Sequence, residues 1–352
     1  MKLKDYISFH RPALEKTLLR YLESKLVEFA DKPLYVQSIN KIKQTVTSGK
    51  LIRGTLILLA YESRKNTITP DAMKLAASME LFHAGLLIHD DIMDDDHLRR
   101  GKPTVLAQSI LDGKKFHANN PENYGNAMAI CIGDLALFMA YELIGSLEDT
   151  SQSLRILQTS ALELQKVGFA QITDIHFGLS DFEPSEEEII DLYKFKTARY
   201  SFSLPLRIGG MLAGYDDITL QNFESFGESL GIAFQIKDDE LGIYGDEKIM
   251  GKPVGSDIRE NKKTLFRHAL FRSVDEAVRP ELELIYGSKK LTEEDMTIIR
   301  EYLKKHNVLS LVQKVREDKS IAAKNILNNI DIPQKYKLVF ADLVDFSNDR
   351  DK

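Results

Sequence analysis

Aspartates gather at two places in the chain, each time directly after an apolar stretch. The first group follows Leu86-Leu87-Ile88 and contains Asp90, Asp91 and Asp94. Residues four apart on a helix lie on one face, so we expect the carboxylates of Asp90 and Asp94 to point in the same direction. Like charges at this spacing repel each other unless a cation lies between them. Oxygen ligands suit Mg²⁺, which proteins usually share with substrate phosphates.

The second group lies in the segment Phe234–Gly242. It contains the neighbours Asp238 and Asp239, and Gln235 shares a helix face with Asp238 at a spacing of three residues. A single acidic helix end is as often a solvated surface as a metal site. The presence of two such groups favours a site in which they face each other across a helical bundle and hold a metal ion together with a diphosphate.

Basic residues follow both acidic groups. Arg99 and Arg100 come shortly after the first group, and their planar guanidinium groups suit phosphate oxygens. After the second group, Lys252 lies in a glycine-containing segment that is followed by Lys262, and such segments can fold over an anion. Lys196 lies in an otherwise apolar helical stretch, where a lysine is unusual.

These side chains need a scaffold, and apolar residues recur at the spacings of three and four that are typical of helices. The pattern predicts helices near residues 14–29, 73–88, 125–147, 153–178, 185–213, 217–244, 260–273, 293–305, 309–328 and 335–346. Ser185 and Thr292, each followed by acidic residues, are predicted helix starts. The stretches 128–147 and 200–212 are apolar nearly all round, so we expect them in the middle of a bundle. No linker or repeat divides the chain, and the sequence predicts a single all-α domain over residues 1–352 with ten or more helices.

Composition excludes several classes of protein. The chain has 352 residues with 47 Lys+Arg and 53 Asp+Glu, a net charge of −6, so the basic surface of a nucleic-acid-binding protein is not expected. The single cysteine, Cys131, excludes an intramolecular disulfide and a cysteine-based zinc site, and we expect it to be a small core residue.

Apolar runs such as residues 55–61 are far shorter than a membrane span. The charged N-terminus lacks the apolar core of a signal peptide. We therefore expect a soluble, cytoplasmic protein without a membrane span.

In their order along the chain, these motifs resemble the trans-type (head-to-tail) isoprenyl diphosphate synthases, which form the polyprenyl synthetase family. Asp90-Asp91-x-x-Asp94, followed by Arg99-Arg100-Gly101, resembles the first aspartate-rich motif of the family, and Phe234-Gln235-x-x-Asp238-Asp239 resembles the second. The resemblance covers the chain from about Lys50 to Lys262.

The chain departs from the family pattern at several positions. Gly242 stands in place of the last aspartate of the second motif, which looks like a variant seen among geranylgeranyl diphosphate synthases. Leu51 and Gly54 stand where many members carry arginine and proline.

The resemblance implies a large helical bundle of the isoprenoid synthase type with a central substrate cavity, and a homodimer. It also implies a prenyltransferase that condenses isopentenyl diphosphate with dimethylallyl, geranyl or farnesyl diphosphate. The allylic diphosphate ionises with the help of Mg²⁺, three ions per active site, and condensation and elimination give a linear all-trans prenyl diphosphate. In an apolar, water-poor pocket, metal and cations would stabilise the departing diphosphate.

The resemblance also assigns roles residue by residue. Binding of the isopentenyl diphosphate would fall to Lys50, Arg53, His83 and Arg100. Binding of the allylic diphosphate would fall to Arg99, Lys196, Thr197, Gln235, Lys252 and Lys262. The metal ligands would be Asp90, Asp94 and Asp238, supported by Asp91 and Asp239. A lone histidine is more often a core residue, but His83 lies seven residues, or two turns, before Asp90 on the same helix face.

Product length depends on the residues beneath Asp90. Gly85 leaves room where relatives with short products carry an aromatic ring, and Phe82 and Leu86 would form the floor of the cavity. We expect a product of twenty carbons, with longer products left open.

Two other functions are compatible with the motifs. A class I terpene cyclase also ionises allylic diphosphates with Mg²⁺ on an all-α fold, but it has no second diphosphate for Lys50, Arg53 and His83 to bind. A non-catalytic subunit of a prenyl synthase would not need the intact first motif.

Overall fold

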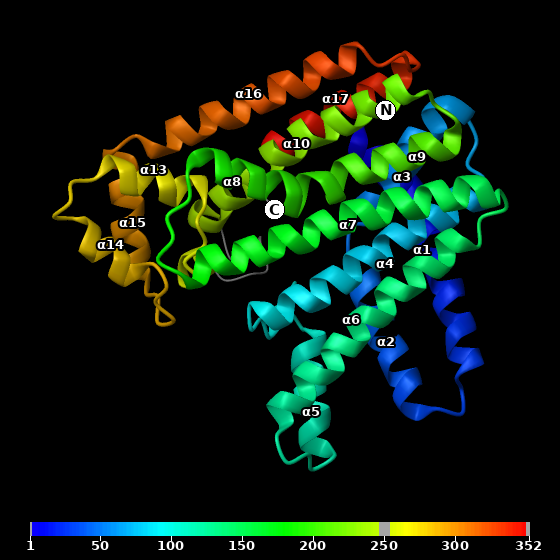
Figure 1. Ribbon diagram of the computed structural model, residues 1–352, viewed down its shortest axis with the longest axis horizontal. Coiled ribbons are helices and arrows are strands. Elements are labelled where there is room, and N and C mark those ends of the chain that lie inside the picture. The colour runs from blue at the N-terminus through cyan, green and yellow to red at the C-terminus, as the bar shows by residue number, and fades with distance from the viewer. Residues whose placement is uncertain (1, 246–253, 350–352) are drawn as a thin grey trace. The chain divides into compact units, whose positions relative to one another are not determined.

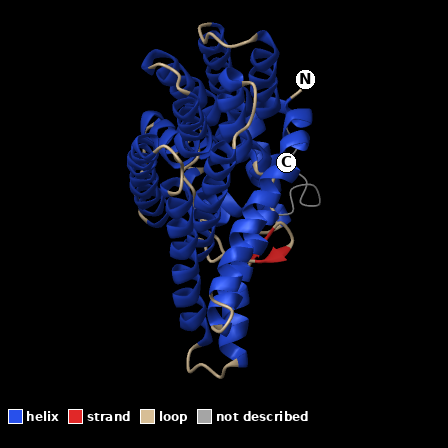
Figure 2. Cartoon of the chain, turned by 90° about the vertical axis from the view of Figure 1, so that its right-hand side faces the viewer, coloured by secondary structure: helices blue, strands red, loops and turns tan. Residues whose placement is uncertain are grey.

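The computed structural model describes residues 2–245 and 254–349, so Lys252 lies outside the described residues. The described part is almost entirely helical, as Figure 2 shows, and the predicted all-α class is confirmed. It divides into two compact units, Met1–Thr159 with Pro205–Asp216 and Ser160–Leu204 with Asp217–Lys352.

The first unit is built around two long helices that pack side by side, α4 (Pro70–Met93) and α6 (Pro121–Gly145) (Figure 1). The other helices of this unit are α1 (Leu3–Glu28), α2 (Pro33–Thr47), α3 (Ile52–Lys65) and α5 (Val105–Lys115), together with the first part of α7 (Thr150–Leu179) and most of α9 (Leu204–Ala213). The backbones of α4 and α6 approach closely, because a Cβ on Gly85 would lie 2.9 Å from the carbonyl oxygen of Gly133.

A two-stranded hairpin follows α4. Strands β1 (Leu98–Arg99) and β2 (Lys102–Pro103) pair antiparallel, with Arg99 opposite Lys102. The two residues between them, Arg100 and Gly101, have φ values of 53° and 71°. Positive φ at both central positions is the geometry that a tight two-residue hairpin requires, and it fixes the two neighbouring arginines on a short, rigid turn.

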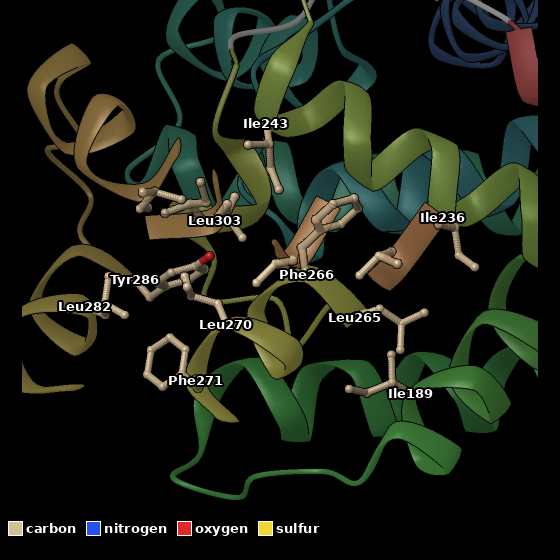
Figure 3. Packing of buried hydrophobic residues seen from close by; sticks show 14 of the residues in the cluster. Ile189, Ile236, Ile243, Leu265, Phe266, Leu270, Phe271, Leu282, Tyr286 and Leu303 are labelled. Carbon is tan, nitrogen blue, oxygen red and sulfur yellow. The ribbon is translucent and has the colours of Figure 1, made fainter. Parts of the chain in front are cut away.

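The second unit surrounds α10 (Asp217–Tyr244), which carries the second acidic group. Its other elements are α8 (Glu186–Tyr193), η1 (Lys194–Ser203), α12 (Ser256–Arg259), α13 (Leu265–Ser273), α14 (Arg279–Ile285), α15 (Glu293–Lys305), α16 (Val308–Asn328) and α17 (Gln334–Asp349), with the second part of α7. Figure 3 shows the buried cluster in which Ile236 of α10, Ile189 of α8 and Leu265 of α13 lie near Phe266. This core fixes the helix from which the second acidic group projects.

Predicted helix starts and the predicted buried stretch are largely confirmed. Ser185 and Thr292 each form a capping box with the acidic residue three positions later. Most residues between 200 and 212 are buried. The predicted helix over 185–213 is in fact α8, the π-helix η1 and α9 in succession. The change from η1 to α9 comes just before Pro205, which has no N–H to donate to the preceding turn.

Other expectations for the elements are wrong. Helices α2, α3, α5 and α14 and the hairpin were not predicted, because their apolar residues are few or are interrupted by lysine, arginine and glycine. The predicted helix over 260–273 begins only at Leu265, and the segment before it contains the short α12.

Helix α6 is not buried all round. Among the described residues it is the one helix that is long and apolar enough to cross a membrane, and 44% of its most apolar window is buried inside the structure. Ile130, Leu135 and Phe138 are exposed on it. Cys131 is exposed too, so its predicted place in the core is wrong. A helix that is apolar all round does not reveal from its sequence which face is covered.

Candidate functional site

The first acidic group lies at the C-terminal end of α4. Asp90 and Asp91 belong to its last turn, and Asp94 is the C-cap residue, with its backbone N–H bonded to the carbonyl oxygen of Asp90 at 2.9 Å. The C-terminal end of a helix carries partial negative charge, so carboxylates are unfavourable there unless a cation is close. This position and the all-oxygen donor set fit a divalent cation.

Arg99 of the hairpin turns back onto this acidic group. Its Nε lies 2.6 Å from Asp91 Oδ1, and its Nη2 lies 3.7 Å from Asp90 Oδ2 and 3.6 Å from Asp96 Oδ2. Burial raises the pKa of Asp91 to about 6, although the charge of Arg99 acts in the opposite direction. Arg99 therefore bridges carboxylates in this structure and is in place beside them.

A cluster of positive charge lies where the hairpin meets the turn between α2 and α3. Arg100 donates from Nη1 to Ser48 Oγ at 3.2 Å, which brings the hairpin to the turn that carries Lys50. Burial, and then the neighbouring charges of Arg99 and Arg53, lower the pKa of Arg100. Lys50 is exposed on that turn.

His83 belongs to the same cluster. Burial, and then the charges of Arg53, Arg100 and Arg99, hold the pKa of His83 well below its usual value, so its imidazole is neutral at pH 7. The structure thus brings together Arg53, His83 and Arg100, three of the four residues predicted to bind isopentenyl diphosphate. Crowded cations of this kind favour binding of an anion.

A buried carboxylate anchors this cluster. Glu80 Oε1 accepts a hydrogen bond from the backbone N–H of Gly54 at 2.7 Å, at the start of α3. Proline, which many relatives carry at this position, has no N–H to donate. Leu51 is buried with a φ of 53°, so it contributes an apolar contact rather than a charge.

The predicted floor residues lie along α4, but one expectation about them is wrong. Phe82 is buried and meets the ring of Tyr141 edge to face, with 4.8 Å between ring centroids. Leu86 is partly buried. Gly85 leaves no empty room, because a Cβ there would lie 2.8 Å from Leu137 Cδ2 of α6. The glycine permits close helix packing instead.

The second unit contains a small cavity of about 90 Å³ that collects most of the residues predicted there. Five residues with a predicted role line it, namely Lys196, Thr197, Gln235, Asp239 and Lys262. The rest of the lining is Asp174, Leu192, Tyr193, Asp257, Lys263 and Thr264. Residues from α7, η1, α10 and the segment before α13 therefore meet at one place.

A chain of hydrogen bonds fixes the polar wall of this cavity. Thr197 donates to Gln235 Oε1 at 2.8 Å, and Gln235 Nε2 donates to Asp239 Oδ1 at 2.9 Å. The hydroxyl of Tyr193 donates to the other oxygen of Asp239 and accepts from the backbone N–H of Leu265 at 3.0 Å. Burial, and then the charge of Asp257, raise the pKa of Asp239 well above its usual value.

Two lysines of this cavity share one carboxylate. Lys196 donates to Asp174 Oδ2, and Lys262 donates to the same oxygen at 3.0 Å. Burial alone would raise the pKa of Asp174, but the charges of the two lysines lower it. Asp174 thus holds two cations side by side at the cavity.

Asp238 lies beside Asp239 on α10 and is partly buried. Asp257 comes close to the position where the second motif lacks its last aspartate, since a Cβ on Gly242 would lie 3.0 Å from Asp257 Oδ2.

Sequence analysis gave no site role to Tyr193 and Asp257. Asp174 lies one turn after Gln171, a spacing compatible with a supporting role at the site or with hydrogen bonding between buried helices, and in the structure it lines the cavity and accepts from Lys196 and Lys262. Among the described residues, no three His, Cys, Asp or Glu side chains are gathered closely enough to hold a metal ion by themselves.

Comparisons with known proteins identify the family of the chain. The sequence model of the polyprenyl synthetase family matches residues 36–303. The chain is 32% identical over 290 residues to the short chain isoprenyl diphosphate synthase of Methanocaldococcus jannaschii, which covers 82% of this chain and 83% of the relative. It is 33% identical over 284 residues to the geranylgeranyl diphosphate synthase of Saccharolobus solfataricus, covering 79% of each.

Among solved structures, the chain is similar to a geranylgeranyl pyrophosphate synthase from Corynebacterium glutamicum that was crystallised with isoprenyl diphosphate and magnesium. The TM-score is 0.88 at 27% sequence identity, over 99% of this chain and 100% of that chain. The corresponding enzyme of Pyrococcus horikoshii gives a TM-score of 0.82 at 28% identity, over 99% and 98%. The chain therefore belongs to the polyprenyl synthetase family and is a trans-prenyltransferase, as its two aspartate motifs predict.

Proposed function

We propose that this trans-prenyltransferase condenses isopentenyl diphosphate with an allylic diphosphate and releases geranylgeranyl diphosphate or a somewhat longer linear product. The observation that carries the proposal is that each unit holds its own set of basic side chains beside an acidic group. Arg53, His83 and Arg100 serve the isopentenyl diphosphate, with Lys50 on the neighbouring turn. Lys196 and Lys262 serve the allylic diphosphate, and this role extends to Lys252 and Arg99.

Asp90, Asp94 and Asp238 are the proposed ligands of Mg²⁺, with three ions per site. The described residues do not form a closed metal cage, so diphosphate and water oxygens complete the coordination. When bound, the metal supplies neutralising charge for the leaving diphosphate. Lys196 and Lys262 add to this charge, and the oxygens of Thr197 and Gln235 face the carbon that becomes positive.

We propose further that residues 1–352 form a single catalytic domain with a substrate cavity. Phe82 and Leu86 set its depth and Gly85 holds α4 against α6. On this account Phe82→Ala lengthens the product, because the ring that meets Tyr141 is lost. Chromatography of the dephosphorylated products checks this, and an unchanged product distribution would count against Phe82 as the floor.

A soluble, cytoplasmic homodimer is proposed as the working form. Cys131, Leu135 and Phe138 follow each other at spacings of four and three, so they lie on one exposed face of α6, which a second copy would cover. Phe138→Asp should then give a monomer in sedimentation, whereas Phe9→Asp on exposed α1 should not. A Phe138→Asp variant that sediments as the wild type does would contradict this interface.

The function is tested by mixing the protein with Mg²⁺, labelled isopentenyl diphosphate and, separately, dimethylallyl, geranyl or farnesyl diphosphate. Linear prenols after dephosphorylation are the expected result. Cyclic hydrocarbons from a primer alone would identify a terpene cyclase instead. Absence of product from every primer, by protein that still binds magnesium diphosphate, would identify a non-catalytic subunit.

A further inference from the structure

The segment that carries Lys196 and Thr197 is an unusual helix. Element η1 is a π-helix of ten residues, Lys194–Ser203, between α8 and α9. π-Helical stretches are rare, are mostly single turns and are frequent at functional sites. Contacts with neighbouring elements must therefore stabilise this one.

Arg199 supplies the strongest of these contacts. Its Nε and Nη2 lie 2.7 and 2.8 Å from the two carboxylate oxygens of Glu163 on α7. Its Nη1 lies 3.0 Å from Glu228 Oε2 on α10, and Nη2 also donates to Glu224 one turn earlier. Arg199 is only 8% exposed, and a two-pronged arginine–carboxylate contact fixes both distance and orientation.

The charges of this network balance. Lys166 pairs with Glu163 at 2.7 Å, and Lys194 pairs with Glu228 at 2.8 Å. Three cations therefore meet the three glutamates of the network. A buried arginine is tolerated when its partners neutralise it, but loss of one member leaves uncompensated charge.

The two helices that bond Arg199, α7 and α10, also carry the residues that bond Lys196 and Thr197. On α7, Glu163 lies eleven residues before Asp174, which is about three full turns, so both point toward η1 from one face. On α10, Glu228 and Gln235 are seven residues apart and likewise share a face. Arg199 bonds Glu163 and Glu228, whereas Lys196 bonds Asp174 and Thr197 bonds Gln235.

Between these two sets of contacts η1 touches α10 directly. A Cβ on Gly231 would lie 2.4 Å from the Cα of Ala198, so only glycine permits this approach. Residues 196–199 are thus fixed at both ends and in the middle. A change of helix register at Arg199 would be transmitted to Lys196 and Thr197.

We propose that Arg199 is a positioning residue for the allylic diphosphate site: it holds η1 in its π register and thereby aims Lys196 and Thr197 into the cavity. The inference rests on the proposed function, because it assigns these two residues to the allylic diphosphate. It predicts different effects on the two substrates, which a general structural role would not predict. The isopentenyl diphosphate residues belong to the other unit and should be unaffected.

The test compares Arg199→Met and Arg199→Lys with the wild type. We expect kcat/KM for the allylic diphosphate to fall about tenfold to hundredfold in Arg199→Met, with a raised KM. The KM for isopentenyl diphosphate should stay within about twofold of the wild type. Arg199→Lys keeps the charge but not the two-pronged contact with Glu163, so its kcat/KM for the allylic diphosphate should fall less than that of Arg199→Met.

Arg316→Met is the matched control. Arg316 of α16 is a mostly buried arginine that pairs with Glu240 of α10 at 2.8 Å. Its loss should lower the melting temperature without changing the ratio of the two KM values. Hydrogen exchange gives a readout independent of activity: the amides of 194–203 should exchange faster in Arg199→Met, and those of α16 should not.

Equal changes in both KM values, or no change in either, would overturn the proposal, and so would unchanged exchange in η1. If Arg199→Met does not fold, Glu224→Gln removes one contact and carries the same predictions at smaller size. Failure of the proposed function is a separate outcome, because it appears as a wild type that forms no prenyl product from any primer.

Discussion

The two units meet the same task, holding a diphosphate, with opposite charge arrangements. In the first unit burial, and then the charges of neighbouring arginines, lower the pKa values of both His83 and Arg100. In the second unit Lys196 and Lys262 share the carboxylate of Asp174. The first site has positive charge to offer an anion directly. The second is already compensated, so an incoming diphosphate must compete with Asp174 and gains more from a metal ion.

The largest expected effect comes from removing a proposed metal ligand in either unit. Asp90→Ala and Asp238→Ala should each lower turnover on the order of a hundredfold or more, the scale for losing stabilisation of transition-state charge. Binding of isopentenyl diphosphate alone should change little in either variant. Steady-state kinetics and equilibrium binding check the two halves of this prediction. Turnover within a few-fold of the wild type for both variants would remove the metal assignment.

The next prediction concerns the packing of α4, which carries the first site, against α6. Gly85→Ala places a Cβ 2.8 Å from Leu137 Cδ2, so it should cost about 1–3 kcal/mol in the free energy of unfolding. Adding Leu137→Ala should return part of that loss, because it removes the side-chain atoms of the clash but leaves the carbonyl oxygen of Gly133 at 2.9 Å. Denaturant unfolding of the single and double variants measures both. Additive losses would show that the two residues do not share this contact.

A smaller effect isolates the cationic cluster. Arg100→Gln should raise the KM for isopentenyl diphosphate about tenfold, the scale of one charge-assisted hydrogen bond, and leave the KM for the allylic diphosphate unchanged. Lys102→Gln on the same hairpin, exposed and opposite Arg99, is the control. An equal effect of both variants would point to general surface charge.

The smallest effect is a pH dependence of stability. His83 has a folded-state pKa well below its ordinary value of 6.5, so below pH 6.5 the unfolded chain takes up a proton that the folded chain refuses. Stability is therefore complete above this pH and falls as pH decreases, by up to about 1.4 kcal/mol per pH unit from this group. His83→Gln should show less acid destabilisation between pH 6.5 and 5 in denaturant titrations. A parallel pH dependence would mean that His83 titrates normally.

The helix that carries the first acidic group was predicted well, and the surroundings of the second group less completely. Spacing predicted His83, Asp90 and Asp94 along one helix, and α4 carries the first two and ends at Asp94 as its C-cap, because the geometry of a regular helix follows from residue number alone. The hairpin that brings Arg100 to Ser48 depends on positive φ values at Arg100 and Gly101, and this backbone conformation was not predicted from the sequence.

In the second unit the prediction found Lys196, Thr197 and Gln235 but not all of the residues that fix them. Tyr193 ends α8 and Arg199 lies in η1, a π-helix that a periodicity of three and four does not describe. Gly85 shows a similar limit. Because glycine has no side chain, the sequence predicted empty space beside it, but Leu137 of the neighbouring helix α6 fills that space.

The contrast between the two sites is tested most directly by titration calorimetry of each diphosphate with and without Mg²⁺. Isopentenyl diphosphate should bind with similar affinity in EDTA and in Mg²⁺, because the arginine cluster suffices. A non-ionisable thio analogue of the allylic diphosphate should bind weakly in EDTA and at least about tenfold more tightly in Mg²⁺. Equal metal dependence of the two ligands would contradict the account of one cation-rich and one charge-compensated site.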